Sequence, residues 1–495
     1  MKRLIDLEFD NSFAGLPAGF HSRVRPTPLK GAHLISVSPA AAALIDLPPD
    51  SLCNDAAVEW LGGSSPLPGT EPVAMCYAGH QFGHFVPQLG DGRAMVLGEV
   101  LTEQGSRWEL QLKGAGVTPY SRDGDGRAVL RSTIREFLCS EAMQALGVPT
   151  TRALCMLGSE EAVYRERIEC AAVLVRMAPS HVRFGSFEVF FYRQQYDHLR
   201  CLADYVIDHD YPHLRDQPEP YVALLSDVVR RTARLMAQWQ LVGFAHGVMN
   251  TDNMSILGLT LDYGPFGFMD AYEPGYVCNH SDHQGRYAFD RQPSIGLWNL
   301  TCLAQAMLPL LHPDGSEASV ERARELLADY EPMLAEAYAR GMRAKLGLRE
   351  ERSGDRALGT RLLALMEANR VDYTNLFRDL AEFRVNELTP AARLRDRFID
   401  RTGFDAWAGD YRTRLRLEDS EDGMRSAAMR GVNPRYILRN YLAQQAIERA
   451  EQGDFGEVEQ LLTLLSRPFD DQPGMAAYAA EPPEWGRHLE ISCSS

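Results

Sequence analysis

The chain has 495 residues, a formal net charge of −16 and an apolar content of 45%. This length is ample for a large core, and the acidic balance disfavours a nucleic-acid-binding surface. Asp6, Glu8 and Asp10 stand where a signal peptide would need an apolar stretch, and no uninterrupted apolar run approaches the length of a membrane span. We therefore expect a cytoplasmic protein that binds neither nucleic acid nor membrane.

The first half of the chain predicts mainly strands. Residues 1–70 are rich in Pro, Gly and Ala and indicate an irregular N-terminal extension. Residues 90–113 predict two strands with a turn at Gly105, and 131–146 predict a helix that ends at Gly-Val-Pro. Alternating segments within 151–178 predict further strands.

From about residue 220 the pattern becomes helical. The apolar spacing from 221 to 243 is typical of a long amphipathic helix, and a loop-and-strand stretch follows at 244–272. Further helices are expected at 295–312, 317–346, 356–386, 388–402 and 434–451. The layout favours an α+β fold with two lobes: a β-rich N-lobe at 71–180 and a helical C-lobe at 181–495, which includes a catalytic segment at 244–285.

The segment FAHGVMNTDNMSILG, from Phe244, is followed by LDYG from Leu261. His246, Asn253 and Asp262 have the order and separation of a protein-kinase catalytic loop and its metal-binding Asp-Phe-Gly motif. An amide oxygen and a carboxylate suit Mg²⁺. Val248 stands where a kinase carries its base, and Asp252 is the nearest carboxylate. The alternative is a polar turn that caps its own backbone.

The upstream half carries the other parts of a nucleotide site in the expected order. A glycine turn contains Gly90 and Gly92, Lys113 ends a strand, and Glu136 in the next helix is placed to pair with Lys113. Three arginines are candidates for phosphate binding, because guanidinium groups match phosphate oxygens; they are Arg93, Arg176 and Arg183. Surface salt bridges are the alternative role for these arginines.

The glycine-rich loop 114–126 lies between Lys113 and the helix. Its backbone N–H groups can bind anions and its carboxylates can accept hydrogen bonds from a ribose or base, which favours ligand contact at Asp125 and Gly126. The alternative is an ordinary flexible insertion.

Several long motifs resemble the selenoprotein O family of protein adenylyltransferases. They are YAGHQFGH from Tyr77, QLGDGRA from Gln88, LKGAG from Leu112, TPYSR from Thr118, DGDGRAVLRSTIRE from Asp123, HGVMNTDNM from His246, LDYGPFGFMD from Leu261 and NPRYILRN from Asn433, with a near-terminal cysteine at Cys493. The resemblance spans almost the whole chain. It implies a protein-kinase-like fold and transfer of AMP from ATP to Ser, Thr or Tyr hydroxyls of proteins, with release of pyrophosphate.

The resemblance also assigns roles to individual residues. It implies that Asn253 and Asp262 bind Mg²⁺, or alternatively Mn²⁺, and that Asp252 accepts the proton. The remaining candidates would hold ATP in a reversed orientation: Lys113, Arg93, Arg176 and Arg183 at the outer phosphates, Gly90 and Gly92 along the nucleotide, and Asp125 and Gly126 at its base end.

Three alternatives remain open at the level of sequence: UMP transfer from UTP, a phosphotransferase with Asp252 as a displaced base, and a nucleotide-binding pseudokinase. Retention of Lys113, Glu136, Asn253 and Asp262 disfavours the pseudokinase. The nine cysteines include no CxxC pair, which disfavours a zinc site. We hypothesise that Cys278, beyond the Asp262 motif, and Cys493, in the tail, form a regulatory disulfide; two reduced thiols are the alternative.

Overall fold

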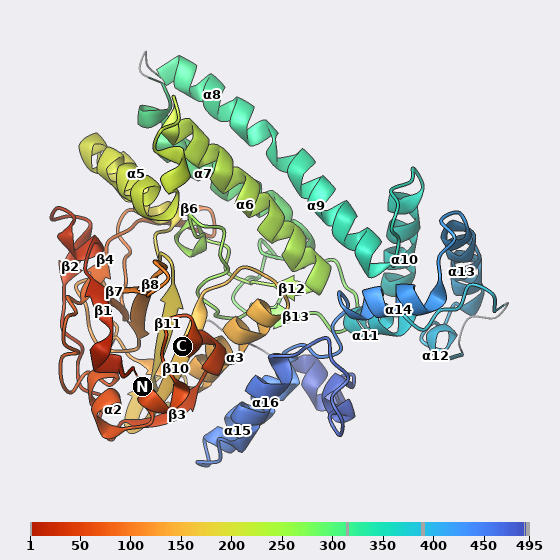
Figure 1. Ribbon diagram of the computed structural model, residues 1–495, viewed down its shortest axis with the longest axis horizontal. Coiled ribbons are helices and arrows are strands. Elements are labelled where there is room, and N and C mark those ends of the chain that lie inside the picture. Colours follow the sequence, from red (N-terminus) through yellow and green to blue (C-terminus); the bar gives the residue numbers. More distant parts are fainter. Residues whose placement is uncertain (1, 313–315, 388–391, 490, 492–495) are drawn as a thin grey trace.

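The computed structural model describes residues 2–312, 316–387, 392–489 and 491 (Figure 1). It is a mixed α/β protein with one large antiparallel sheet and many helices. The sheet has nine strands, with β2-β4-β7-β8-β11-β10-β3 as its main path, and β1 and β9 joined to β7 and β11. Their bounds are β1 Glu8–Asp10, β2 His21–Arg23, β3 His33–Val37, β4 Val73–Met75, β7 Ala94–Leu101, β8 Arg107–Lys113, β9 Ala128–Val129, β10 Arg152–Tyr164 and β11 Ile168–Ala178.

The expectation of an irregular N-terminal extension is wrong in part. Strands β1, β2 and β3 from this region join the sheet, and helices α1 (Pro39–Ala43) and α2 (Asp55–Leu61) pack against it. Leu4, Ile45 and Leu61 are buried in one core with Leu110 and Leu112 of β8. These strands have only three to five residues, which is too short for an alternating pattern to stand out.

The opposite face of the sheet is covered by α3 (Leu130–Ala145), which packs on β10 and β11. Two helices then precede the point where the sequence predicts a helical part: α4 (Phe184–Tyr192) and α5 (Tyr196–Asp210). In α4, seven of nine residues are buried. A helix buried on nearly all sides has no polar face, so its sequence lacks the amphipathic period that predicts a helix.

The helical layer continues with α6 (Pro220–Val242) and α7 (Gln292–Leu311), which pack on each other (Figure 1). The stretch Phe289–Leu311 is long and apolar enough to cross a membrane by length and composition, with a mean hydropathy of 1.3, which the sequence analysis did not foresee. Of its most apolar 18-residue window, 56% is buried inside the protein, and α7 also packs against α4. These contacts are those of a core helix.

The helix expected at 317–346 is two helices, α8 (Ser316–Ala328) and α9 (Tyr330–Lys345), and the one expected at 356–386 is α10 (Asp355–Asn369) and α11 (Tyr373–Leu380). Part of the helix expected at 388–402 lies outside the described residues. The next helices are α12 (Ala392–Arg395), α13 (Arg401–Arg416) and α14 (Asp422–Arg430), which share a separate core with α9 to α11. The last helices are α15 (Asn440–Ala450), shorter than expected, and α16 (Gly456–Leu465); both pack on α3 (Figure 1).

Candidate active site

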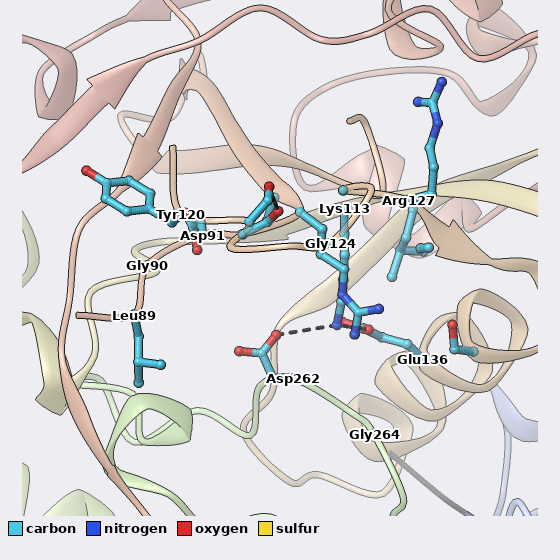
Figure 2. Close-up of a pocket in the computed structure, with 18 of the residues that line it drawn as sticks. Leu89, Gly90, Asp91, Lys113, Tyr120, Gly124, Arg127, Glu136, Asp262 and Gly264 are labelled. Carbon is cyan, nitrogen blue, oxygen red and sulfur yellow. Dashed lines mark hydrogen bonds and ion pairs between the residues drawn. The ribbon is translucent and has the colours of Figure 1, made fainter. Parts of the chain in front are cut away.

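A cavity of about 420 Å³ lies where the strands β7, β8 and β11 meet the loops at 244–265. It brings together residues that are far apart in the sequence (Figure 2). Of the predicted site residues, it is lined by Gly90, Gly92, Arg93, Lys113, Asp125, Gly126, Arg176, Asn253 and Asp262. The other two, Arg183 and Asp252, lie beside the cavity and contact one another there.

Lys113 and Glu136 form an ion pair at the back of the cavity, as expected from the sequence. Lys113 is the last residue of β8, and its Nζ lies 2.5 Å from Glu136 Oε2 on α3. Leu110 and Leu112 are fully buried on β8. Burial lowers the pKa of Lys113, and Glu136 opposes that shift. The pair therefore fixes the Lys113 side chain at the cavity wall.

Asp262 lies close to Lys113 (Figure 2) and is surrounded by three cations in all. Its Oδ1 lies 2.6 Å from Arg176 Nη1 and 3.4 Å from Lys113 Nζ, and its Oδ2 lies 2.7 Å from Arg183 Nη1. Burial acts to raise the pKa of Asp262, but these cations outweigh it and hold that pKa well below its usual range. Asp262 also has a left-handed backbone, with φ of 57°, which is rare for a residue other than glycine.

Both arginines that contact Asp262 are buried, and further contacts orient them. Arg176 on β11 donates from Nε to Gln111 Oε1 at 2.5 Å and pairs with Glu136 Oε1 at 2.9 Å. Arg183 stacks over the ring of Tyr77 at 4.5 Å and donates to the carbonyl of Asp252 at 2.6 Å. Buried arginines held in this way form a preorganised cluster of positive charge, which suits the binding of phosphate groups.

The acidic residue Asp252 and the amide Asn253 lie in a short 3₁₀ turn, Thr251–Asn253. Asn253 donates from Nδ2 to the carbonyl of Val248 at 3.0 Å. This hydrogen bond involves the amide nitrogen of Asn253 and does not engage its Oδ1. Asp252 is buried; its Oδ2 accepts from Gln81 Nε2 at 3.2 Å, whereas its Oδ1 has no hydrogen-bond partner within the described part of the chain. Burial raises the pKa of Asp252 to about 7, against the opposing effect of Arg183. A buried carboxylate with one unused oxygen can accept a proton from a nearby hydroxyl.

The glycines are required by packing within the loops. A Cβ at Gly90 would lie 2.5 Å from the ring of Tyr120, and a Cβ at Gly126 would lie 2.1 Å from the backbone of Gly116. Both glycines also have positive φ, 122° and 70°. They allow the loop 114–126 to pack tightly over the cavity.

Asp125 is held by an arginine that the sequence analysis missed. Both of its carboxylate oxygens accept from Arg165, each at 2.8 Å, and the backbone N–H of Arg127 donates to Oδ1 at 2.9 Å. The hydrogen bonds from Arg165 lower the pKa of Asp125. Arg165 follows Asp125 by 40 residues in the sequence and lies in the turn between β10 and β11. No local sequence pattern indicates that it belongs to the site.

A small hairpin consists of β5 (Gly79–Gln81) and β6 (His84–Val86). It contacts the turn Thr251–Asn253, which we call the candidate catalytic turn, and the sequence did not indicate that this hairpin belongs to the site. The backbone N–H of His80 donates to Thr251 Oγ1 at 2.7 Å, and the Thr251 hydroxyl donates to Glu188 Oε2 at 2.8 Å. His80 Nδ1 lies 3.0 Å from Glu188 Oε1. These contacts fix the hairpin to α4 and to the candidate catalytic turn.

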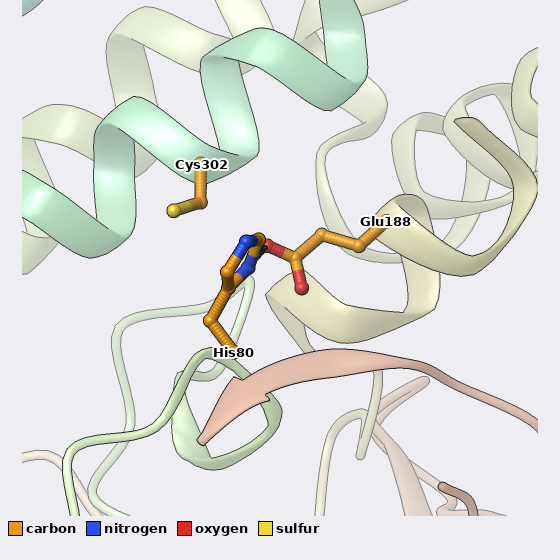
Figure 3. Close-up of side chains that lie close together, drawn as sticks. All are labelled: His80, Glu188 and Cys302. Carbon is orange, nitrogen blue, oxygen red and sulfur yellow. Dashed lines mark hydrogen bonds and ion pairs between the residues drawn. The ribbon is translucent and has the colours of Figure 1, made fainter. Parts of the chain in front are cut away.

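Cys302 of α7 faces His80 and Glu188 (Figure 3). The candidate ligand atoms of the three residues lie within 4.8 Å of one another, which is a spacing that could hold a metal ion. The Glu188 carboxylate is already satisfied by His80 and Thr251, however, and burial raises the pKa of the Cys302 thiol to about 12. Hydrogen bonds therefore account for the position of Glu188 beside His80.

Cys278 lies against the catalytic segment, with its thiol donating to the carbonyl of Ala245 at 3.4 Å. Two residues later, the backbone N–H of His280 donates to the carbonyl of Ile491 at 3.0 Å. The predicted partner, Cys493, lies outside the described residues. Ile491 nevertheless brings the end of the chain to the segment that carries Cys278.

A cavity with a lysine, buried arginines, a carboxylate and an amide oxygen is typical of an enzyme that transfers a phosphate-containing group. The family model for "Protein adenylyltransferase SelO" matches residues 3–466. The chain is 60% identical to "Protein nucleotidyltransferase YdiU" of Thioalkalivibrio sulfidiphilus and 58% identical to the protein of the same description from Myxococcus xanthus, in both cases over the whole of both chains. The chain therefore belongs to the SelO family of protein adenylyltransferases.

Proposed function

We propose that this enzyme transfers AMP from ATP to Ser, Thr or Tyr hydroxyls of proteins and releases pyrophosphate. The observation that carries this proposal is the convergence of Lys113, Arg176 and Arg183 on one point of the cavity, which suits a departing pyrophosphate. Val248, where a kinase has its base, cannot accept a proton, whereas Asp252 is buried beside the cavity with Oδ1 unpartnered among the described residues. The family description and the names of the relatives agree with nucleotidyl transfer to protein.

The residues of the site have distinct proposed roles. Asp252 accepts the proton of the attacking hydroxyl. Lys113, Arg93, Arg176 and Arg183 hold the phosphates and stabilise the charge that grows on the departing pyrophosphate. Gly90 and Gly92 lie along the nucleotide, and Asp125 and Gly126 approach its base end.

The donor set around Asp262 fits a divalent cation, Mg²⁺ or Mn²⁺. A carboxylate offers about four acceptor positions, and the cations around Asp262 occupy three of them. The side-chain oxygen of Asn253 is a second hard ligand at the same cavity. When bound there, such an ion would neutralise phosphate charge.

The proposal also includes a protein-kinase-like fold with two lobes. A protein-kinase-like architecture would place the boundary between a β-rich N-lobe and a helical C-lobe near residue 180, after β11, with residues 1–70 as an extension that completes the sheet. We also propose a cytoplasmic location and partners limited to ATP and protein acceptors, without nucleic acid or membrane.

The experiment that tests the proposal compares ATP labelled at the α-phosphate with ATP labelled at the γ-phosphate, each with Mg²⁺ or Mn²⁺. Label should reach protein only from the α-position, and a parallel arm with α-labelled UTP compares UMP transfer. Label that arrives only from the γ-position would instead establish a phosphotransferase. No transfer of either label, with ATP still bound, would indicate a pseudokinase.

The role of Asp252 is tested by Asp252→Asn, which keeps the shape of the side chain and its contact with Gln81. We expect kcat to fall by roughly 100- to 10,000-fold, as for loss of a general base. The dissociation constant for ATP should remain within about threefold of the original value, because Asp252 is not assigned to the phosphates. Full activity of this variant would remove Asp252 from the mechanism.

A further inference from the structure

The tip of the β5–β6 hairpin lies directly against the candidate catalytic turn. The backbone N–H of Phe82 donates to Asn250 Oδ1 at 3.2 Å and to the Tyr287 hydroxyl at 3.0 Å. The preceding residue, Gln81, donates to Asp252. A Cβ at Gly79 would lie 2.8 Å from Asp252 Oδ1, so the base of the hairpin also touches this carboxylate. The hairpin is therefore part of the wall around the unpartnered oxygen.

Phe82 has an unfavourable backbone for its residue type. The two-residue turn has φ of 50° at Phe82 and 86° at Gly83, as in type I′ turns, which prefer Asn or Gly at the first position. A bulky residue in this region strains the backbone. Phe82 is also 40% exposed, although its ring packs on Tyr287 with centroids 5.1 Å apart. An exposed aromatic side chain at a strained position beside a catalytic carboxylate suggests a binding role.

An arginine lies next to the same turn. The Arg286 guanidinium stacks on Trp298, 4.6 Å from the ring centroid, and lies 3.4 Å from the point where a Cβ of Gly83 would be. Arg286 is only half-buried and forms no ion pair with a carboxylate of the described residues. This leaves a positive charge beside Gly83, in the same turn as Phe82.

We propose that the hairpin tip binds the protein acceptor, and that the acceptor is a segment in which a bulky apolar side chain and an acidic side chain flank the hydroxyl residue. The apolar side chain contacts Phe82 and the acidic side chain pairs with Arg286, which places the hydroxyl residue between them, at the hairpin that packs on Asp252. This inference rests on the proposed function, because it names the class of substrate for the same site. The His80–Glu188–Thr251 contacts hold the hairpin in place for this task.

The test uses synthetic peptides with one central Ser, Thr or Tyr and α-labelled ATP. The flanking positions carry alanine, phenylalanine, aspartate, or both phenylalanine and aspartate. The intact enzyme should label the doubly substituted peptides roughly tenfold or more faster than the alanine peptides at low peptide concentration, which corresponds to about 1.4 kcal/mol.

Two variants separate the two contacts. Phe82→Asn removes the ring and places a residue that tolerates positive φ, so the protein should unfold at the same or a higher temperature while losing the preference for phenylalanine. Arg286→Gln should lose the preference for aspartate and keep that for phenylalanine. The matched control Ile399→Asn removes an apolar side chain that is 89% exposed before α13, and it should keep both preferences.

Each outcome decides the proposal. Equal labelling of all peptides, or preferences that survive both variants, would overturn it. Label on whole proteins but on no peptide would also overturn it, since a linear segment would then not be the ligand. If α-label reaches neither peptides nor proteins, the proposed function itself fails.

Discussion

At the scale of single residues, Asp262 is the carboxylate that compensates three positive charges at the site. Lys113, Arg176 and Arg183 approach it from β8, β11 and the loop before α4. Without this carboxylate, the three cations would face one another across a buried space, and like charges at such distances repel strongly. Asp262 is thus a candidate metal ligand and also the anion that holds the three cations in place.

The variant Asp262→Asn tests both roles. We expect transfer of α-label to fall by roughly 100-fold or more, because a metal ligand and the arrangement of the cations are lost together. We also expect the free energy of unfolding to fall by about 3 kcal/mol, because breaking a buried ion pair leaves charges uncompensated. Labelling assays and urea denaturation measure the two effects.

A matched control is Glu141→Gln. Glu141 is also buried and pairs with Arg152 at 2.6 Å, but it does not line the cavity. It should lose stability by a comparable amount and keep transfer. If both variants lose transfer equally, the effect of Asp262→Asn is structural and its assigned role is wrong.

The sequence indicated which residues gather at the cavity better than it indicated their partners. The order of Lys113, Glu136, Asn253 and Asp262 follows from short local motifs, and the structure places all four at one cavity. Partnerships such as Gln81 with Asp252 join residues 171 positions apart. No local pattern records such a pair, because it depends on how the hairpin folds onto the candidate catalytic turn.

At the scale of elements, α9 ends in a lysine that is buried in a hydrophobic core. Lys345 is 5% exposed, and its Nζ lies 4.2 Å from the ring centroid of Phe377 and 5.2 Å from that of Tyr373. Burial lowers the pKa of Lys345 to about 7 from its ordinary value of 10.5. The helices α9 to α14 therefore contain a group that resists being charged.

This burial predicts a pH dependence of stability. The unfolded chain keeps its proton on Lys345 up to about pH 10.5, whereas the folded protein releases it near pH 7. Unfolding therefore takes up a proton between these values, and the free energy of unfolding should rise with pH in this window. Below about pH 7 the full penalty, on the order of 4 kcal/mol, is present.

The variant Lys345→Met should be more stable than the original protein at pH 7 and should lose most of the rise between about pH 7 and pH 9. Urea denaturation at several pH values measures this difference. Arg356→Met, on the exposed side of α10, serves as a control that should leave the pH profile unchanged. An unchanged profile for Lys345→Met would show that the ammonium is hydrated in the folded protein.

Helices were predicted well where they have one polar face and poorly where they do not. The amphipathic helix α6 begins and ends within a few residues of its prediction, whereas α4 was missed because its side chains are buried all round. The helix expected at 317–346 divides at Asp329, between α8 and α9. Such a division depends on the packing of both helices against α6, which the sequence does not display.

At the scale of the whole molecule, the segment after Asp262 is braced by distant parts of the chain. Arg439, which precedes α15 and is 1% exposed, pairs with Asp270 and also with Asp372, at 2.9 Å. Ile491 accepts the backbone hydrogen bond of His280. The described C-terminal part therefore restrains the region next to the proposed metal site.

The disulfide between Cys278 and Cys493 is the prediction that tests this connection. Treatment with oxidised glutathione, which takes up the two electrons and two protons, should produce a peptide that links the two cysteines. The rate of transfer should then differ between the oxidised and reduced forms, because the crosslink ties the tail to the segment that contains Cys278. Cys278→Ser should abolish the linked peptide and the difference in rate, whereas Cys53→Ser, at an exposed cysteine far along the chain, should retain both. If mass mapping of the oxidised protein finds no linked peptide, the tail is held by contacts such as that of Ile491 alone, and the proposed redox control is wrong.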